Sequence, residues 1–193
     1  MIDGTLAGVL QAAKYSVQSP RAGARALMDM RLPMSIRWLA FGLVIVGSSL
    51  LTVIAVRLSP AGGEPAVQQV LSQPFALAVM QGAVMLVFAQ LMFRVGQMAG
   101  GKGSFADALL LLTWVQFILM LVQVLQIVLE VVIPPAANLV GLLGFGLMLW
   151  LVTHFVAELH GFTSLGTVFA GIVGTVLAAG FAVTVLIVGI VGA

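Results

Sequence analysis

Five long apolar stretches dominate the chain, and short segments with glycine, proline and most of the charge separate them. A bilayer core about 30 Å thick is crossed by about 20 helical residues, and each stretch reaches that length. The third is the longest and is expected to tilt; Pro134-Pro135 directly after it cannot continue a helix. The pattern predicts five transmembrane helices, over residues 36–56, 75–98, 105–133, 136–158 and 165–192.

Residues 1–35 are too polar to cross a membrane, and their apolar side chains recur at helical spacing. They predict two amphipathic helices, the second beginning at Ser19-Pro20, because serine is a good N-cap and proline suits the first helical position. Arg25 and Asp29 lie four residues apart there and are expected to pair. Two interpretations of this arm stay open: helices lying in the headgroup region, or a solvated cytoplasmic arm.

The composition supports the membrane assignment. Hydrophobic residues make up 62% of the chain, charged residues only 7%, and the mean hydropathy is +1.21, whereas a soluble surface needs far more charge. We therefore expect an all-α integral membrane protein, with an amphipathic arm (1–35) followed by a five-helix transmembrane domain (36–193). The lack of cysteine excludes disulfides and thiolate sites, and a net charge of +2 without a basic patch argues against nucleic-acid binding.

The distribution of lysine and arginine predicts the orientation, because basic residues concentrate in cytoplasmic loops. With the N-terminus inside, only Arg57 of the eight basic residues lies on the outer side. The C-terminus then lies outside, since the number of spans is odd. The cytoplasmic basic residues would be Lys14, Arg21, Arg25, Arg31, Arg37, Arg94 and Lys102.

The stretch GQMAGGKGSF, residues 96–105, is close to a phosphate-binding loop. Such a loop needs a strand before it and a hydroxyl after its lysine, but a predicted membrane helix precedes it and Gly103 follows Lys102. The pattern therefore argues against nucleotide binding, and we interpret the loop as a helix hinge. Gly100, Gly101 and Gly103 permit a tight reversal with positive φ. Lys102 is a candidate contact for a lipid phosphate.

Ser104 is expected to cap the third span, with Asp107 in its first turn. Polar residues also recur inside the second and third spans, where they are costly. One reading is a polar path or substrate cavity; the reading we favour is hydrogen bonding between packed helices. The candidate faces are Gln90, Arg94 and Gln97 on the second span, and Gln116, Gln123, Gln126 and Glu130 on the third.

The fourth span ends with a group of polar residues, His154, Glu158 and His160. Two histidines and a carboxylate are a possible metal-ligand set, but no metalloprotease pattern accompanies them. We instead expect Glu158 or Asp107 to pair with Arg94, because all three should lie at the cytoplasmic ends of their helices. The candidate polar cluster is therefore Arg94, Asp107, His154 and Glu158.

Small residues recur every four positions along the fifth span, which allows another helix to approach closely. We expect that helix to belong to the same chain, with a partner protein as the alternative. The stripe consists of Gly166, Ala170, Gly174, Ala178 and Ala182.

Three segments, SPRAGARALMDMRLP, GGKGSFADALLLLTWVQ and LWLVTHFVAELHGFTSLGTVFAG, together with the layout of the spans, resemble the Yip1 domain family in its short prokaryotic branch. The resemblance covers residues 19–192. It implies five spans and a cytoplasmic N-terminus. We expect the membrane to be a bacterial inner membrane, with the C-terminus in the periplasm. Eukaryotic members are linked to vesicle traffic, Rab-type GTPases and membrane shaping, but their acidic-leucine-glycine-proline signature is not recognisable here. No site residues carry over.

Taken together, these features predict a non-catalytic scaffold, accessory subunit or membrane-organising protein that binds lipids, other membrane proteins or itself. The alternative is a small-solute or ion transporter that uses the polar faces of the second and third spans. No enzyme chemistry, cofactor, metal or nucleic acid is expected.

Overall fold

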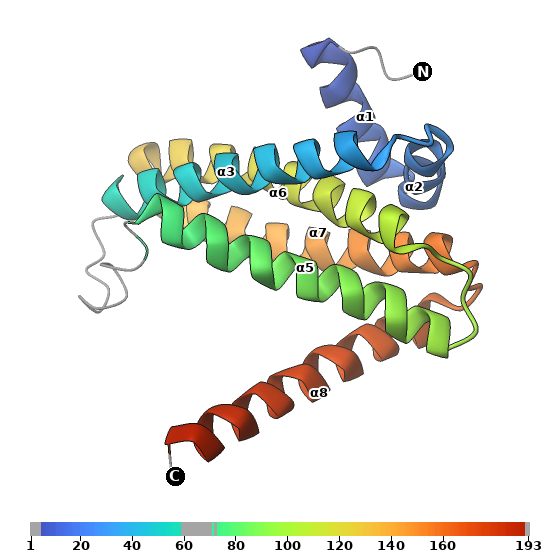
Figure 1. The fold of residues 1–193 in the computed structure, drawn as a ribbon. Helices are drawn as coiled ribbons and strands as arrows, with labels where there is room; N and C mark the ends of the chain where they lie inside the picture. The colour runs from blue at the N-terminus through green and yellow to red at the C-terminus, as the bar shows by residue number, and fades with distance from the viewer. Residues whose placement is uncertain (1–4, 59–70, 72, 192–193) are drawn as a thin grey trace.

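The computed structural model describes residues 5–58, 71 and 73–191, and these residues form helices and connecting turns without a strand. The first four residues of the predicted arm and Gly192, the last residue of the predicted fifth span, lie outside them. Figure 1 shows the helices in order: α1 (Leu6–Gln18), α2 (Pro20–Asp29), α3 (Met34–Leu58), α5 (Pro74–Met98), α6 (Phe105–Val132), α7 (Pro134–His160) and α8 (Leu165–Val191).

Five of these helices, α3, α5, α6, α7 and α8, are long and apolar enough to cross a membrane, which confirms the predicted all-α membrane bundle. Successive spans run in opposite directions, so the starts of α3, α6 and α8 lie at the same end as the ends of α5 and α7. The helices α1 and α2 lie at this end too (Figure 1). We call it the basic end, because Arg57, in the last turn of α3, is the single basic residue at the opposite end.

Helix α6 lies at the centre of the bundle. It packs on α3, α5 and most extensively on α7. Near the basic end Ala108, Leu109 and Leu111 are fully buried, whereas Val124 and Val128, further along the same helix, are exposed. The core therefore sits in the half of the bundle nearer the basic end.

The α1–α2 hairpin caps this core instead of standing apart as an arm. In α2, Gly23, Ala24 and Leu27 are buried, and the helix packs on α7 and α6. A Cβ on Gly23 would lie 2.7 Å from Ser16 Oγ of α1, so only glycine lets the two helices cross here. Trp114 Nε1 of α6 donates a hydrogen bond to the same Ser16 Oγ at 3.0 Å. Neither open interpretation of the arm anticipated this docking.

Helix α8 leaves the bundle at an angle. Figure 1 shows it starting beside the end of α7 and diverging from α5 toward its C-terminal end. Val168 is buried on the side that faces the bundle, and Ile172 and Thr175 are partly buried there. Its main helix contact is with α7. Helix α8 is therefore packed against the bundle mainly near its N-terminal end.

Candidate functional site

The glycine-rich loop between α5 and α6 closes around an imidazole ring. Gly96, Gly101 and Gly103 all face the side chain of His160, the last residue of α7, and a Cβ on any of them would collide with it. His160 is only 3% exposed. The three glycines are thus required by the close approach of a side chain. Only Gly100, with a φ of 87°, adopts the left-handed conformation in this loop, so the predicted positive φ at Gly101 and Gly103 is wrong.

Both ring nitrogens of His160 are hydrogen-bonded to the backbone. The Gly103 N–H donates to Nδ1 at 3.2 Å, and Nε2 lies 3.0 Å from the carbonyl oxygen of Met92. An amide N–H can only donate and a carbonyl can only accept, so the ring that satisfies both is neutral with its proton on Nε2. His160 therefore joins α5, the α5–α6 loop and α7.

Helices α5 and α7 end in the same way, each followed by a left-handed glycine. These glycines are Gly100 and Gly161, with φ of 87° and 73°. The amide after each of them donates to the carbonyl five residues earlier, as in a Schellman motif. The ring of Phe162, directly after the second turn, stacks on His160 with centroids 5.5 Å apart. This contact fixes the chain that leads from α7 into α8.

Among the residues that the structure describes, two ion pairs hold the helices at the basic end, and neither contains Arg94. Arg37 Nη1 of α3 lies 2.7 Å from Asp107 Oδ1 of α6. Arg25 Nη2 of α2 lies 2.6 Å from Glu158 Oε1 of α7. The predicted pairing of Arg94 with Asp107 or Glu158 is therefore wrong, because each carboxylate has a different arginine as its partner.

Helix α2 is tied to the chain just before α8. Arg21 Nη2 donates to the carbonyl oxygens of Phe162 at 2.9 Å and Thr163 at 3.4 Å. Arg25 points across to α7, so the predicted pairing with Asp29 within α2 is not formed. Both arginines of α2 thus contact the region where α7 gives way to α8.

The polar faces predicted on the second and third spans do not face each other. Gln90, Arg94 and Gln97 are exposed on the outer side of α5. On α6, Gln123 faces α3 instead, where its Nε2 donates to Thr52 Oγ1 at 3.1 Å. This contact is of the helix-packing kind that we favoured.

A second polar contact, between α3 and α5, was not anticipated. Ser48 Oγ and Ser49 Oγ each lie 3.2 Å from Gln81 Oε1. Both hydroxyls already donate to carbonyls of their own helix, at 2.8 Å. Their single protons are therefore used, and we assign the amide the other way round, with its NH₂ donating to both oxygens. Two adjacent serines inside the first apolar stretch were the sequence signal.

The rest of the predicted α6 face is spread over different surroundings. Gln116 lines a cavity on the α8 side. Gln126 Nε2 lies 2.8 Å from where a Cβ of Gly141 would be, so it occupies the space left by that glycine on α7. Glu130 is partly exposed, two residues before α6 ends. These side chains do not form a common path.

The possible metal ligands at the end of α7 have other partners. His154 Nδ1 lies 2.8 Å from the Trp150 carbonyl oxygen, and its ring packs on the Trp150 ring at 4.0 Å between centroids. Glu158 is paired with Arg25, and both nitrogens of His160 contact the backbone. Among the residues that the structure describes, no three histidine or carboxylate side chains gather as a metal site.

The small-residue stripe of α8 is not packed against another helix in the described part of the chain. All five residues are exposed, and a Cβ on Gly166 or Gly174 would meet no atom within 4 Å. The expected packing against another helix of the same chain is therefore wrong for the described residues. The inner side of α8, toward the bundle, carries Val168, Ile172 and Thr175, which do not belong to the stripe.

Between that inner side of α8 and helices α5, α6 and α7 lies a cleft made of two adjoining cavities. Their volumes are about 330 and 500 Å³, within the range of ligand-binding pockets. Phe88 and Val176 line both cavities and are 43% and 44% exposed, so the cleft opens to the surroundings of the bundle. Sequence reasoning missed this cleft because its apolar lining looks like any other part of a span.

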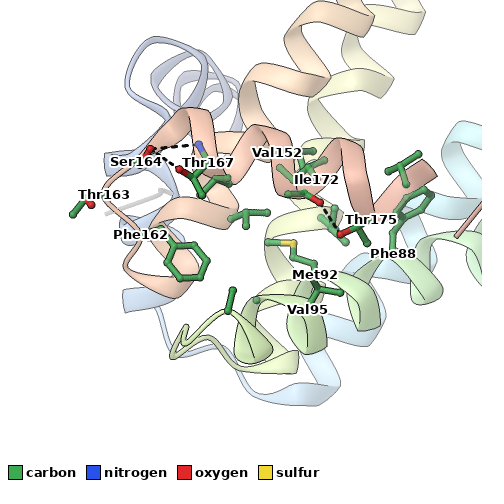
Figure 2. A pocket seen from close by; sticks show the side chains of 17 residues that line it. Phe88, Met92, Val95, Val152, Phe162, Thr163, Ser164, Thr167, Ile172 and Thr175 are labelled. Atoms are coloured by element: carbon green, nitrogen blue, oxygen red, sulfur yellow. Dashed lines mark hydrogen bonds between the residues drawn. The ribbon is translucent and has the colours of Figure 1, made fainter. Parts of the chain in front are cut away.

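The cleft is most polar at one end. Figure 2 shows Ser164 and Thr167 at the start of α8, hydrogen-bonded to each other at 2.9 Å, and mostly apolar side chains from there onward. Deeper in, the Thr175 hydroxyl donates to the Gly171 carbonyl of its own helix at 2.7 Å. The second cavity adds only Gln81 and Gln116 as polar residues. An apolar cleft with a polar end suits an amphiphile.

Comparisons with known proteins give one match. A family model described as the Yip1 domain matches residues 14–187, nearly the whole chain. No curated protein matches the chain. No solved structure matches it either.

Proposed function

The chain belongs to the Yip1 domain family, and from that premise we propose that it is a non-catalytic membrane-organising protein that binds lipid in the cleft beside α8. The observation that carries the proposal is the cleft itself, which opens sideways between α5 and α8. In a bilayer, an apolar space of this kind is accessible to lipid chains.

The contacts of the polar residues favour binding over transport. The glutamines Gln81 and Gln123 lie in helix–helix contacts with Ser48, Ser49 and Thr52. The exposed polar face of α5 points away from α6. A transporter needs polar groups along one continuous route, and these side chains are distributed over several unconnected surfaces.

We further propose a bacterial cytoplasmic membrane, with the basic end inside the cell and the C-terminus in the periplasm. The support is the distribution of charge, because seven of the eight basic residues belong to the basic end and Arg57 alone to the other. The proposed lipid site then opens to the inner leaflet.

The test is purification of the full chain from its native membrane in gentle detergent, followed by mass spectrometry of retained lipids. Val176→Trp fills the cleft, and we expect it to lose most of the retained lipid. Val185→Trp places the same ring at an exposed position of α8 outside the cleft and should retain lipid like the unaltered protein.

Two outcomes contradict the proposal. Equal lipid retention in folded Val176→Trp and Val185→Trp would show that the cleft is not the lipid site. A stoichiometric membrane protein that co-purifies and is lost in Gly174→Leu, without a retained lipid, would favour an accessory subunit docked on the α8 stripe.

A further inference from the structure

We propose that the cleft selects an anionic phospholipid, with its headgroup at the basic end and an acyl chain between α5 and α8. This inference rests on the proposed function, that the cleft binds lipid, and adds the class of headgroup and the direction in which the lipid lies. Three features of the cleft support it: its length, its polarity and the charge at its mouth.

The length of the cleft fits one leaflet. Its lining runs along α8 from Ser164 to Leu177, which is about 20 Å at 1.5 Å per residue. The hydrocarbon core is about 30 Å thick, so an acyl chain in one leaflet spans about 15 Å. The cleft is thus about 5 Å longer than the acyl region of one leaflet. This extra length places the headgroup at the level of Ser164 and the α7–α8 turn.

The polarity of the lining sets the direction. Hydroxyls of Ser164 and Thr167 lie at the mouth, where one donates to the other and the second keeps its proton for a further acceptor such as a phosphate oxygen. Toward the middle of the bundle the lining consists mainly of apolar side chains such as Phe88, Val152 and Ile172. Two glutamines also line it there, Gln81, which is bonded to Ser48 and Ser49, and Gln116. A headgroup in the depth of the cleft would lose its hydration there.

The charge at the mouth favours an anion. Arg21 donates to the carbonyls of Phe162 and Thr163, both of which line the mouth, and these neutral oxygens leave its positive charge in place. The nearby carboxylate of Glu158 is already neutralised by Arg25. Among the described residues, Arg21 is thus a cation directly beside the mouth that is not paired with a carboxylate, at a depth where a phosphate would lie.

The test measures lipid exchange into nanodiscs that contain the full-length protein. Phosphatidylcholine nanodiscs are titrated with phosphatidylglycerol vesicles or with phosphatidylcholine vesicles of matched acyl chains, and bound lipid is counted by native mass spectrometry. We expect the unaltered protein to prefer phosphatidylglycerol about fivefold, the ratio that one cation at the surface provides. Arg21→Gln should remove the preference, and Arg21→Lys, which keeps the charge, should restore it.

Arg94→Gln is the matched control, because Arg94 is an exposed cation at the same end whose side of α5 faces away from the cleft. It should leave the preference unchanged. If Arg21→Gln and Arg94→Gln reduce the preference equally, the selectivity is a general effect of charge and the inference is overturned. It is also overturned if Arg21→Lys behaves like Arg21→Gln in a protein of unchanged melting temperature.

The same measurement separates this inference from the proposed function. Binding of both lipids with equal affinity, abolished by Val176→Trp, would overturn the headgroup selectivity and leave the lipid cleft standing. Binding that Val176→Trp leaves unchanged would overturn both.

Discussion

Helices α6 and α8 are nearly equal in length and hydropathy, yet they occupy opposite situations in the molecule. In the most apolar part of α6, 39% of the residues are buried, whereas the corresponding share in α8 is 6%. Hydropathy measures whether a helix prefers lipid to water, and both helices satisfy that condition. It carries no information on whether the neighbours are protein or lipid.

Polar contacts distinguish the two helices. Helix α6 is joined to α3 through Asp107 and Gln123 and to α1 through Trp114. In the described part of α8, the hydroxyls of Thr175 and Thr184 bond to carbonyls of their own helix. Contacts between helices in a membrane depend on packing and polar bonds more than on apolarity. This difference explains why α6 is packed inside the bundle while most of α8 is exposed.

The largest difference should appear when the same truncation is made in both helices. Leu111 of α6 is fully buried and Leu177 of α8 is 68% exposed. We expect Leu111→Ala to lower the free energy of unfolding by about 3 kcal/mol, because it leaves a cavity in the core. Leu177→Ala should change it by less than about 0.5 kcal/mol. Thermal unfolding in detergent, followed by circular dichroism, measures both; equal losses would contradict the comparison.

A smaller effect is expected where a methyl group is added instead of removed. Gly96→Ala places a Cβ against the ring of His160 and should cost about 2 kcal/mol through overpacking. Gly174→Ala on α8 meets open space and should be neutral or slightly stabilising, because alanine favours the helix. Urea titration of the two variants side by side gives the difference. A stable Gly96→Ala protein would mean that the loop can shift away from His160.

The smallest predicted effect concerns a single interhelical hydrogen bond. Gln123→Leu removes the bond to Thr52, whose own hydroxyl still donates to the Ser48 carbonyl at 2.9 Å, so we expect a loss of about 0.6 kcal/mol. Gln90→Leu, on the exposed side of α5, should cause no loss. Steric-trap unfolding in bilayers resolves effects of this size. A loss above about 2 kcal/mol would indicate that Gln123 belongs to a larger polar network.

Features set by a single helix were predictable from the sequence. Ser104 and Asp107 form the expected cap, with the Asp107 N–H donating to Ser104 Oγ at 3.1 Å. Ser19 occupies the N-cap position of α2 as expected, although its side chain makes no capping bond. The pattern that predicts a cap involves residues a few positions apart, so it needs no knowledge of the other helices.

Features that depend on how the helices are rotated and ordered were not predictable. Charged residues near helix ends all lie at similar depth, so Asp107 had several possible partners, and Arg37 is the one that the rotation of α3 brings to it. Arg94 lies on the outer side of α5 for the same reason. The close contact of Gly96, Gly101 and Gly103 with His160 joins the end of α5 and its following loop to the end of α7, which is far away in the sequence. In a sequence, a glycine required by such a close contact looks the same as a glycine required by a turn.

Because α8 is attached to the bundle mainly at its N-terminal end, a small change in its tilt moves its C-terminal end a long way. Its 27 residues form a rod about 40 Å long, and a tilt of about 10° at the base moves its tip by about 7 Å. Just before the N-terminal end of α8, Arg21 donates hydrogen bonds to the carbonyls of Phe162 and Thr163. The direction in which α8 leaves the bundle, and with it the width of the cleft, is therefore set in part by contacts of the α1–α2 hairpin.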